Sequence, residues 1–263
     1  MTDYLMDNAA PKERKRLQLL EAWADPGTVR YLDTIGVAQG WRCLEIGAGA
    51  GSIARWLCKR VGPDGRVVAT DIDTRLVGTI DADNLEVRRH DIVKDPPVEI
   101  GGFDLVHARL VLEHLVEREQ ALQHMVAALK PGGWLLVEDQ DISSVVAASE
   151  VDERRAQLLL DRSAKLVRLL TLAGVDLQLG RRLFHELREK LVDVSAEGRV
   201  YMVAGGSQLA QFWRMTWESL RVPLTTSGLL TAPEIDEHLA LLDDPSFVWQ
   251  GPTIMAAWGR RRG

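Results

Sequence analysis

The sequence predicts an α/β protein with a Rossmann-like, mostly parallel seven-stranded sheet, helices on both faces, N-terminal helices and a helical cap. Two observations support this fold class. Short apolar runs alternate with helical patterns between residues 41 and 139, a rhythm typical of parallel sheets with right-handed crossovers. The first of these runs leads directly into alternating glycines, which indicates a strand, a tight turn and the start of a helix.

The N-terminal segment, residues 1–40, reads as helical. Apolar residues spaced along one face predict a helix over residues 11–24. Asp25, Pro26 and Gly27 then predict a break, followed by a short helix over residues 29–35 that ends at Gly36.

The next segment, residues 41–139, contains five of the predicted strands. We expect them at residues 41–46, 66–71, 84–89, 103–107 and 133–138, with helices between them that include residues 52–61 and 117–129. Ligands of such sheets bind at the carboxyl ends of the strands. The candidate cofactor residues named below all fall at such ends.

The rhythm changes after residue 139. Residues 140–245 predict a cap of helices around the sixth strand: helices over 151–173, 181–190 and about 209–217, and a strand over 192–203. Another helix begins at Thr231, where Glu234 could complete a capping box. The seventh strand, residues 253–258, lies in the final segment, 246–263, and we treat residues 1–263 as a single domain.

Composition disfavours some classes of partner. The formal net charge of −6 gives no basic footprint for a nucleic acid, and no apolar run approaches the roughly 18 residues of a membrane helix. Cys43 and Cys58 lack metal-ligand spacing and suggest a reducing compartment, so we expect no metal site. Because the N-terminus lacks the apolar core of a signal peptide, we expect a cytoplasmic protein.

The glycine-rich turn predicts a nucleoside-bearing cofactor. Gly47, Gly49 and Gly51 allow the backbone to approach a ligand closely, and Asp71 follows about twenty residues on, where an acid can bind ribose hydroxyls. The alternative for Asp71 is a helix N-cap. The dinucleotide fingerprint requires its third glycine at position 52, which Ser52 occupies, and this disfavours a nicotinamide cofactor.

A second acid follows the third predicted strand. Asp91 could accept a hydrogen bond from an exocyclic amine, and Ile92 could lie against a purine face. The alternative is a turn aspartate that binds its own backbone.

These motifs, together with the segments from Phe103 to Leu115 and from Leu129 to Asp139, resemble class I S-adenosylmethionine-dependent methyltransferases. The group includes enzymes of ubiquinone and menaquinone biosynthesis, and the resemblance covers roughly residues 41–139. It implies S-adenosyl-L-methionine as cofactor and S-adenosyl-L-homocysteine as product. It also implies cofactor-binding residues: Glu45 at the amino group, Gly47, Ala48 and Gly49 along the methionine, Asp71 at the ribose, Ile72, Asp91 and Ile92 at the adenine, and backbone around His107 and Ala108 closing the methionine side.

Catalysis is less clear from the sequence. Methyl transfer depends mostly on alignment and exclusion of water, and a general base helps where the acceptor must lose a proton. His114 and His107 are the candidate bases, and Glu113 is a further possibility. Asp139 and Asp141 could orient a substrate, although we expect solvated loop carboxylates.

The expected substrate is a small, partly apolar molecule of secondary metabolism, methylated on O, N or C. Arg109, Trp213 and Trp217 could line its pocket, and packing in the core is the alternative for the two aromatic residues. We expect His124, His185 and His238 to be surface residues. The helix over 151–173 could also serve a homodimer.

Two other functions remain open. A protein of the same fold could bind S-adenosylmethionine and catalyse a reaction without methyl transfer, such as a cyclisation. A nicotinamide-dependent oxidoreductase is less favoured, and a non-enzymatic binding module is the most distant alternative.

Overall fold

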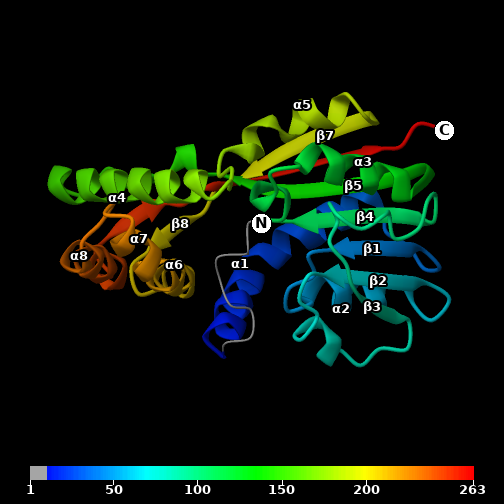
Figure 1. Ribbon diagram of the computed structural model, residues 1–263, viewed down its shortest axis with the longest axis horizontal. Helices are drawn as coiled ribbons and strands as arrows, with labels where there is room; N and C mark the ends of the chain where they lie inside the picture. The colour runs from blue at the N-terminus through cyan, green and yellow to red at the C-terminus, as the bar shows by residue number, and fades with distance from the viewer. Residues whose placement is uncertain (1–10) are drawn as a thin grey trace.

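A seven-stranded sheet forms the centre of the computed structural model, which describes residues 11–263 (Figure 1). The first ten residues, on which the expectation about a signal peptide rests, lie outside the described part. In spatial order the strands are β3 (Leu85–Arg89), β2 (Arg66–Asp71), β1 (Arg42–Ile46), β4 (Phe103–Arg109), β5 (Leu129–Asp141), β10 (Thr253–Arg260) and β7 (Val192–Arg199).

The pairing of these strands confirms the predicted fold class. The first five strands in that order are parallel, and β10 is antiparallel to both of its neighbours, β5 and β7. The strand order reverses between β1 and β4, so a crevice forms at the carboxyl ends of these two strands.

Helices cover both faces of the sheet. On one face α3 (Arg118–Ala128) and α5 (Leu183–Arg188) contribute Leu122, Met125 and Leu187 to a buried cluster. On the other face α1 (Pro11–Ile35) and α2 (Ser52–Val61) contribute Tyr31 and Leu57 to a second cluster. Short 3-10 turns accompany these layers: η1 (Val77–Thr79), η2 (Leu112–His114), η3 (Ile142–Ser144) and η4 (Leu179–Arg182).

The N-terminal segment corrects our prediction of a break at Pro26. Residues Pro11–Ile35 form one continuous helix with Pro26 inside it. A proline removes one helical hydrogen bond, yet Asp25 and Thr28 on either side both accept hydrogen bonds from Arg109. Tertiary contacts on both sides of the proline therefore hold the helix together, whereas the local sequence favours a break.

The cap contains a small sheet in addition to the helices that we predicted. Its helices are α4 (Glu153–Leu172), α6 (Gln208–Ser219), α7 (Arg221–Thr226) and α8 (Ala232–Asp243). Beside them lies a three-stranded antiparallel sheet in the order β6 (Val146–Ala147), β9 (Val248–Gln250) and β8 (Met202–Ala204). The cap lies beyond the carboxyl ends of the parallel strands (Figure 1).

The single strand predicted over residues 192–203 is two strands. β7 pairs with β10 in the large sheet, and β8 pairs with β9 in the small one. Alternating apolar residues predict extended backbone but do not specify which strand will be its partner. The chain therefore passes from the large sheet into the cap within the segment that we read as one strand.

The long cap helix is largely explained by packing. Leu159, Leu166 and Leu170 of α4 are buried in the cap core, whereas Leu160 and Leu172 are exposed.

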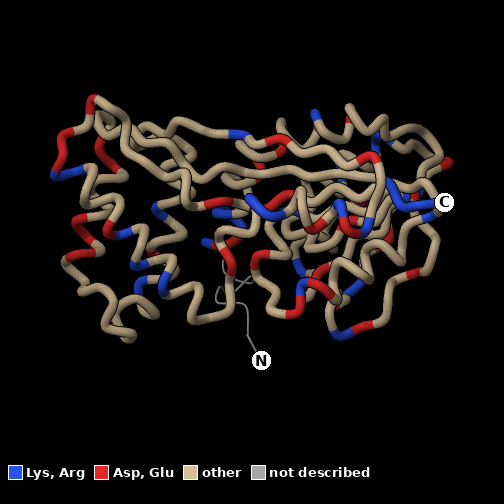
Figure 2. The backbone as a smooth tube through the Cα atoms, turned by 90° about the horizontal axis from the view of Figure 1, so that it is seen from above, with Lys and Arg blue, Asp and Glu red and all other residues tan. Residues whose placement is uncertain are grey.

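Basic and acidic residues are interspersed along both the sheet and the cap (Figure 2). Within residues 11–263, none of the helices combines the length and apolarity needed to cross a membrane.

The predicted capping box at α8 is confirmed and can be tested. Thr231 Oγ1 accepts from the Glu234 backbone N–H, and the Glu234 carboxylate accepts from the Thr231 N–H at 2.8 Å. Thr231→Ala should lower the free energy of unfolding by about 1 kcal/mol in urea titrations, because one N-terminal donor loses its acceptor. Thr226→Ala is the control: this threonine is exposed and caps no helix N-terminus, so a change within about 0.5 kcal/mol is expected. Equal losses in the two variants would contradict a role for the box.

Candidate active site

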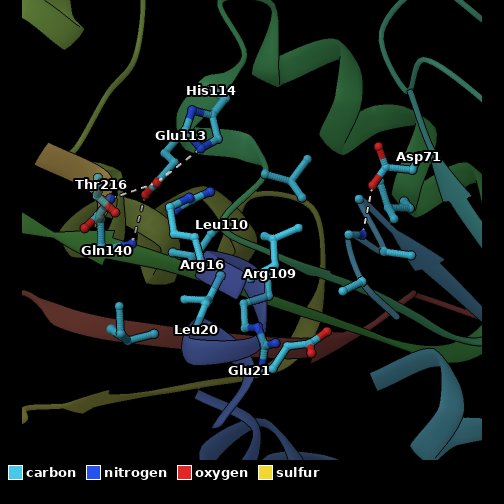
Figure 3. Close-up of a pocket in the computed structure, with 18 of the residues that line it drawn as sticks. Arg16, Leu20, Glu21, Asp71, Arg109, Leu110, Glu113, His114, Gln140 and Thr216 are labelled. Atoms are coloured by element: carbon cyan, nitrogen blue, oxygen red, sulfur yellow. Dashed lines mark hydrogen bonds and ion pairs between the residues drawn. The ribbon is translucent and has the colours of Figure 1, made fainter. Parts of the chain in front are cut away.

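A cavity of about 260 Å³ lies between the strand ends, the cap and α1. Its strand-end wall consists of the loop at residues 45–53 and the residues that follow β2, β3 and β4. Its cap wall is mainly apolar and is formed by Leu166, Leu170, Leu177, Phe212, Trp213 and Leu220. Figure 3 shows Asp71 on one side of this cavity and Glu113, His114 and Gln140 on the other.

The glycine-rich loop follows β1 with backbone that only glycine adopts easily. Gly47, Gly49 and Gly51 all have positive φ angles, and Gly51 is the N-cap of α2. A Cβ atom at Gly47 would lie 2.3 Å from Val111 Cγ2. The loop is therefore held against the segment after β4, and its backbone is exposed to the cavity where a cofactor would lie.

Asp71, at the end of β2, connects this loop to the cavity. Its Oδ2 accepts a hydrogen bond from Gly49 N at 2.9 Å, and its Oδ1 accepts from Asp73 N at 3.0 Å. Burial raises the pKa of Asp71, and these backbone donors oppose that shift. A carboxylate can accept about four hydrogen bonds, so Asp71 retains capacity for a ligand. Asp71 caps no helix in the structure, so the alternative that we left open in the sequence is not observed.

Asp91 makes the turn interaction that was the alternative for it, and it also lies at the cavity. Its Oδ1 accepts from the backbone N–H groups of Val93 and Lys94, which is the turn interaction. Asp91 also lines the cavity beside Ile92 and His90, and Ile72 lies in the same wall. Turn formation therefore leaves the carboxylate at the strand-end wall.

His107 occupies a different position from the one that we expected. It is fully buried in β4, where Nδ1 lies 2.6 Å from Glu45 Oε2 and Nε2 lies 3.1 Å from Glu138 Oε1. Burial alone would lower the pKa of His107, but Glu45 and Glu138 outweigh it and raise the pKa to about 9. The ring is therefore protonated at neutral pH, with both nitrogens bonded to carboxylates. It cannot act as a general base toward the methyl acceptor.

The segment that closes the strand-end wall also corrects our expectation. The residues that line the cavity are Arg109, Leu110 and Val111, whereas His107 and Ala108 lie behind them. Leu110 has a φ of 54°, an uncommon angle for a residue with a side chain. Arg109 ends β4, and this turn brings Leu110 and Val111 to the cavity directly after it.

Arg109 lines the cavity but is occupied by α1. Its guanidinium donates to Asp25 Oδ1 at 2.9 Å and to Thr28 Oγ1 at 2.8 Å. Ser52 Oγ donates to the same carboxylate oxygen at 3.0 Å. Arg109 and Asp25 therefore connect α1, the glycine-rich loop and the segment after β4.

Of the two tryptophans that we expected in the substrate pocket, only Trp213 lines the cavity. Its buried Nε1 has no hydrogen-bond partner among the described residues. Trp217 is buried in the cap core, with its ring 4.1 Å from that of His238, and it does not reach the cavity. His238 is itself only 1% exposed, which corrects our expectation of a surface residue.

A buried polar cluster surrounds Glu113. Glu113 is 2% exposed, and its Oε1 accepts from Gln140 Nε2 at 2.8 Å and lies 3.5 Å from His114 Nε2. Asp139, which we expected to be solvated, is fully buried, and its Oδ1 accepts from Glu113 N at 3.3 Å. Asp141 instead caps η3 and pairs with Arg181.

Residues of α1 are the contributors to the cavity that our sequence analysis missed. Arg16, Leu20, Glu21 and Trp23 all line it, and Arg16 is buried in an ion pair with Glu13. The amphipathic pattern of residues 11–24 indicated a packed helix but could not show that the helix packs against the strand ends.

Comparisons with known proteins agree with this site. A family model described as a methyltransferase domain matches residues 4–184. The chain belongs to the class I S-adenosylmethionine-dependent methyltransferases. Membership makes S-adenosyl-L-methionine its cofactor, and the glycines of positive φ at the strand ends fit a ligand that needs close backbone approach.

Two curated relatives illustrate the range of the similarity. The methyltransferase str2 of Strobilurus tenacellus is 34% identical over 110 residues, 42% of this chain and 39% of the relative. The ubiquinone/menaquinone biosynthesis C-methyltransferase UbiE of Laribacter hongkongensis is 39% identical over 113 residues, 40% of this chain and 46% of the relative. The alignments thus span less than half the length of the curated relatives.

Solved structures share the fold at low identity. The YcgJ protein from Bacillus subtilis has a TM-score of 0.56 at 16% identity, over 89% of this chain and 98% of that one. Haemonchus contortus phosphoethanolamine N-methyltransferase 2 has a TM-score of 0.51 at 15% identity, over 95% of this chain and 53% of that one.

The charged state of His107 predicts a loss of stability in alkali. The folded pKa of about 9 lies above the ordinary value of 6.5, so protonation stabilises the folded state. This contribution, on the order of 3 kcal/mol, is complete below pH 6.5 and is lost as the pH rises through 9. Urea titrations of wild type and His107→Gln from pH 6 to 10 should show this slope in the wild type only. The control, exposed His185→Gln, should retain the wild-type slope.

Proposed function

We propose that this methyltransferase acts on a small, partly apolar molecule of secondary metabolism that binds against the cap wall. The observation that carries the proposal is a single cavity. It joins the glycine-rich loop to an apolar surface formed by Phe212, Trp213 and Leu170. Cofactor and acceptor would share this space, from which the cap and α1 exclude water. Alignment and desolvation are the main contributions that an enzyme makes to this transfer.

The roles of the cofactor residues form part of the same proposal. Gly47, Ala48 and Gly49 would lie along the methionine part, and Glu45 would support its amino group. Asp71 would hold the ribose hydroxyls. The adenine would lie between Ile72 and Ile92, with Asp91 at its exocyclic amine. When bound, the cofactor supplies a methyl group already activated on a sulfonium.

His107 is assigned a supporting role. Because Glu45 Oε2 is hydrogen bonded to His107 and Glu45 also lines the cavity, the imidazolium would hold this carboxylate in position. Arg109 would similarly brace the loop through Asp25, and it lies close enough to the cavity to contact the acceptor.

The relatives and the cap wall both support an acceptor with an apolar ring system. Several relatives are named for C-methylation in ubiquinone and menaquinone biosynthesis, and the apolar cap wall would suit a ring system of that general kind. We also propose that the exposed Leu160 and Leu172 of α4 form part of a homodimer contact.

The first test is calorimetric titration with S-adenosylmethionine, S-adenosylhomocysteine and NADH. We expect micromolar affinity for the first two and no binding of the third, because Ser52 replaces the glycine that a dinucleotide requires. Methyl transfer should then be followed with methyl-labelled cofactor and a panel of phenols, amines and activated ring carbons. Product without consumption of the cofactor would instead indicate a reaction such as a cyclisation.

Removing the ribose carboxylate should weaken cofactor binding selectively. Asp71→Ala should raise the Kd for S-adenosylmethionine by more than tenfold, or about 1.4 kcal/mol, because two hydrogen-bond acceptors are lost. The control is Asp81→Ala, an exposed acid on the loop after η1, which should leave the Kd unchanged. Thermal unfolding of both variants shows whether loss of the Gly49 contact has disturbed the fold. Unchanged affinity in folded Asp71→Ala would refute the ribose assignment.

A further inference from the structure

Glu113 is a buried carboxylate at the surface of the acceptor cavity. It lies in η2, directly after the turn that closes the strand-end wall. Thr216 and Trp213 of α6 line the same cavity from the cap. Figure 3 shows Glu113 together with His114, Gln140 and Thr216, on the other side of the cavity from Asp71. The carboxylate is therefore on the side where an acceptor would bind, away from the residues assigned to the ribose.

The orientation of this carboxylate is set by its neighbours. Gln140 holds both oxygens: its side-chain Nε2 donates to Oε1 at 2.8 Å, and its backbone N donates to Oε2 at 3.3 Å. The backbone of Glu113 is held by Asp139 and by Asp176 N, which donates to the Glu113 carbonyl at 2.7 Å. A carboxylate can accept about four hydrogen bonds, so capacity remains for a ligand.

The surroundings of Glu113 raise its proton affinity, and burial is the largest cause. Burial raises the pKa of Glu113 to about 7, and the hydrogen bonds from Gln140 oppose this shift. The facing groups are Asp139 on β5, Asp176 after α4, His114 on η2 and Arg16 on α1. Burial lowers the pKa of His114 to about 4, with Arg16 contributing, so His114 is the weaker base. The best general base has a pKa near the working pH.

We propose that Glu113 binds a hydroxyl group of the acceptor and takes its proton during methyl transfer, which makes the acceptor a phenol or an enol. The assignment rests on the proposed function of this cavity. Glu113 replaces His114 as the catalytic residue, and His114 serves as a neutral neighbour.

The step balances without a further reactant. The hydroxyl oxygen forms a bond to the methyl carbon as the carbon–sulfur bond breaks, and the electron pair of that bond stays on sulfur. The hydroxyl proton passes to Glu113, which releases it to solvent after the products leave. The sulfonium loses its positive charge and the Glu113 carboxylate loses its negative charge, so the net charge does not change.

The remaining wall fits an aromatic hydroxyl compound. Phe212, Trp213 and Leu170 offer apolar surface, and the buried Trp213 Nε1–H has no hydrogen-bond partner among the described residues. A second oxygen on the ring system would give this indole a partner. The hydroxyl of Thr216 already donates to the Phe212 carbonyl at 2.9 Å, so it is less available as a donor.

The experiment measures binding of 4-methylphenol and 4-methylanisole to the protein saturated with S-adenosylhomocysteine, by ligand-observed NMR. Both probes are neutral between pH 6 and 8, and only the first carries a hydroxyl. We expect 4-methylphenol to bind about fivefold more tightly at pH 8 than at pH 6, because an ionised carboxylate is the stronger acceptor. Binding of 4-methylanisole should not change with pH.

Glu113→Gln should abolish the pH dependence for 4-methylphenol while retaining affinity for S-adenosylhomocysteine, which shows that the variant is folded. Glu117→Gln, an exposed acid four residues away on the same segment, is the matched control and should behave as wild type. Wild-type pH dependence in Glu113→Gln would overturn the assignment to Glu113 and leave the cavity as the acceptor site. If neither probe binds although S-adenosylhomocysteine does, the acceptor site itself is misplaced and the assignment falls with it.

Discussion

A buried row of charge, Glu45–His107–Glu138, joins the three central strands and supports the cofactor side of the cavity. The three residues come from β1, β4 and β5, which are adjacent in the sheet. Removing one partner from a buried ion pair commonly costs about 3–5 kcal/mol, because it leaves an uncompensated charge. The row is tolerated in the interior because both ring nitrogens are matched by carboxylates. It also holds Glu45 at the edge of the glycine-rich loop, where the cavity begins.

The second constraint on the cavity is α1, which connects the strand-end wall to the cap wall. Glu21 and Asp25 accept from Ser52 at the start of α2, and Asp25 also accepts from Arg109 at the end of β4. Trp23 of the same helix packs against Phe212 of the cap, with ring centroids 6.0 Å apart. A movement of α1 would therefore alter the cofactor loop and the cap wall together.

The pKa values of the titratable groups of the site differ because their surroundings differ. His107 is held protonated by two carboxylates, whereas burial near Arg16 keeps His114 neutral. Glu113 gains proton affinity because it is buried, although the hydrogen bonds from Gln140 oppose this shift. The two histidines considered as bases in the sequence analysis thus differ in charge: His107 is protonated and His114 is neutral. Pairs of groups whose pKa values are pushed apart are a recurrent feature of sites that move protons.

The sequence by itself determined the alternating strands and helices of the parallel core and the place of the glycine-rich turn. β2 and α2 have the predicted limits, the capping box at Thr231 is present, and the glycine-rich turn lies at the strand ends. These features depend on interactions within a few residues, such as φ preference and the spacing of apolar side chains. Only the tertiary structure decided that Pro26 lies inside a helix, that residues 192–203 form two strands and that Trp213 rather than Trp217 reaches the cavity. It alone placed His107 between two carboxylates and Glu113 at the cavity, because those environments come from strands and helices distant in the chain.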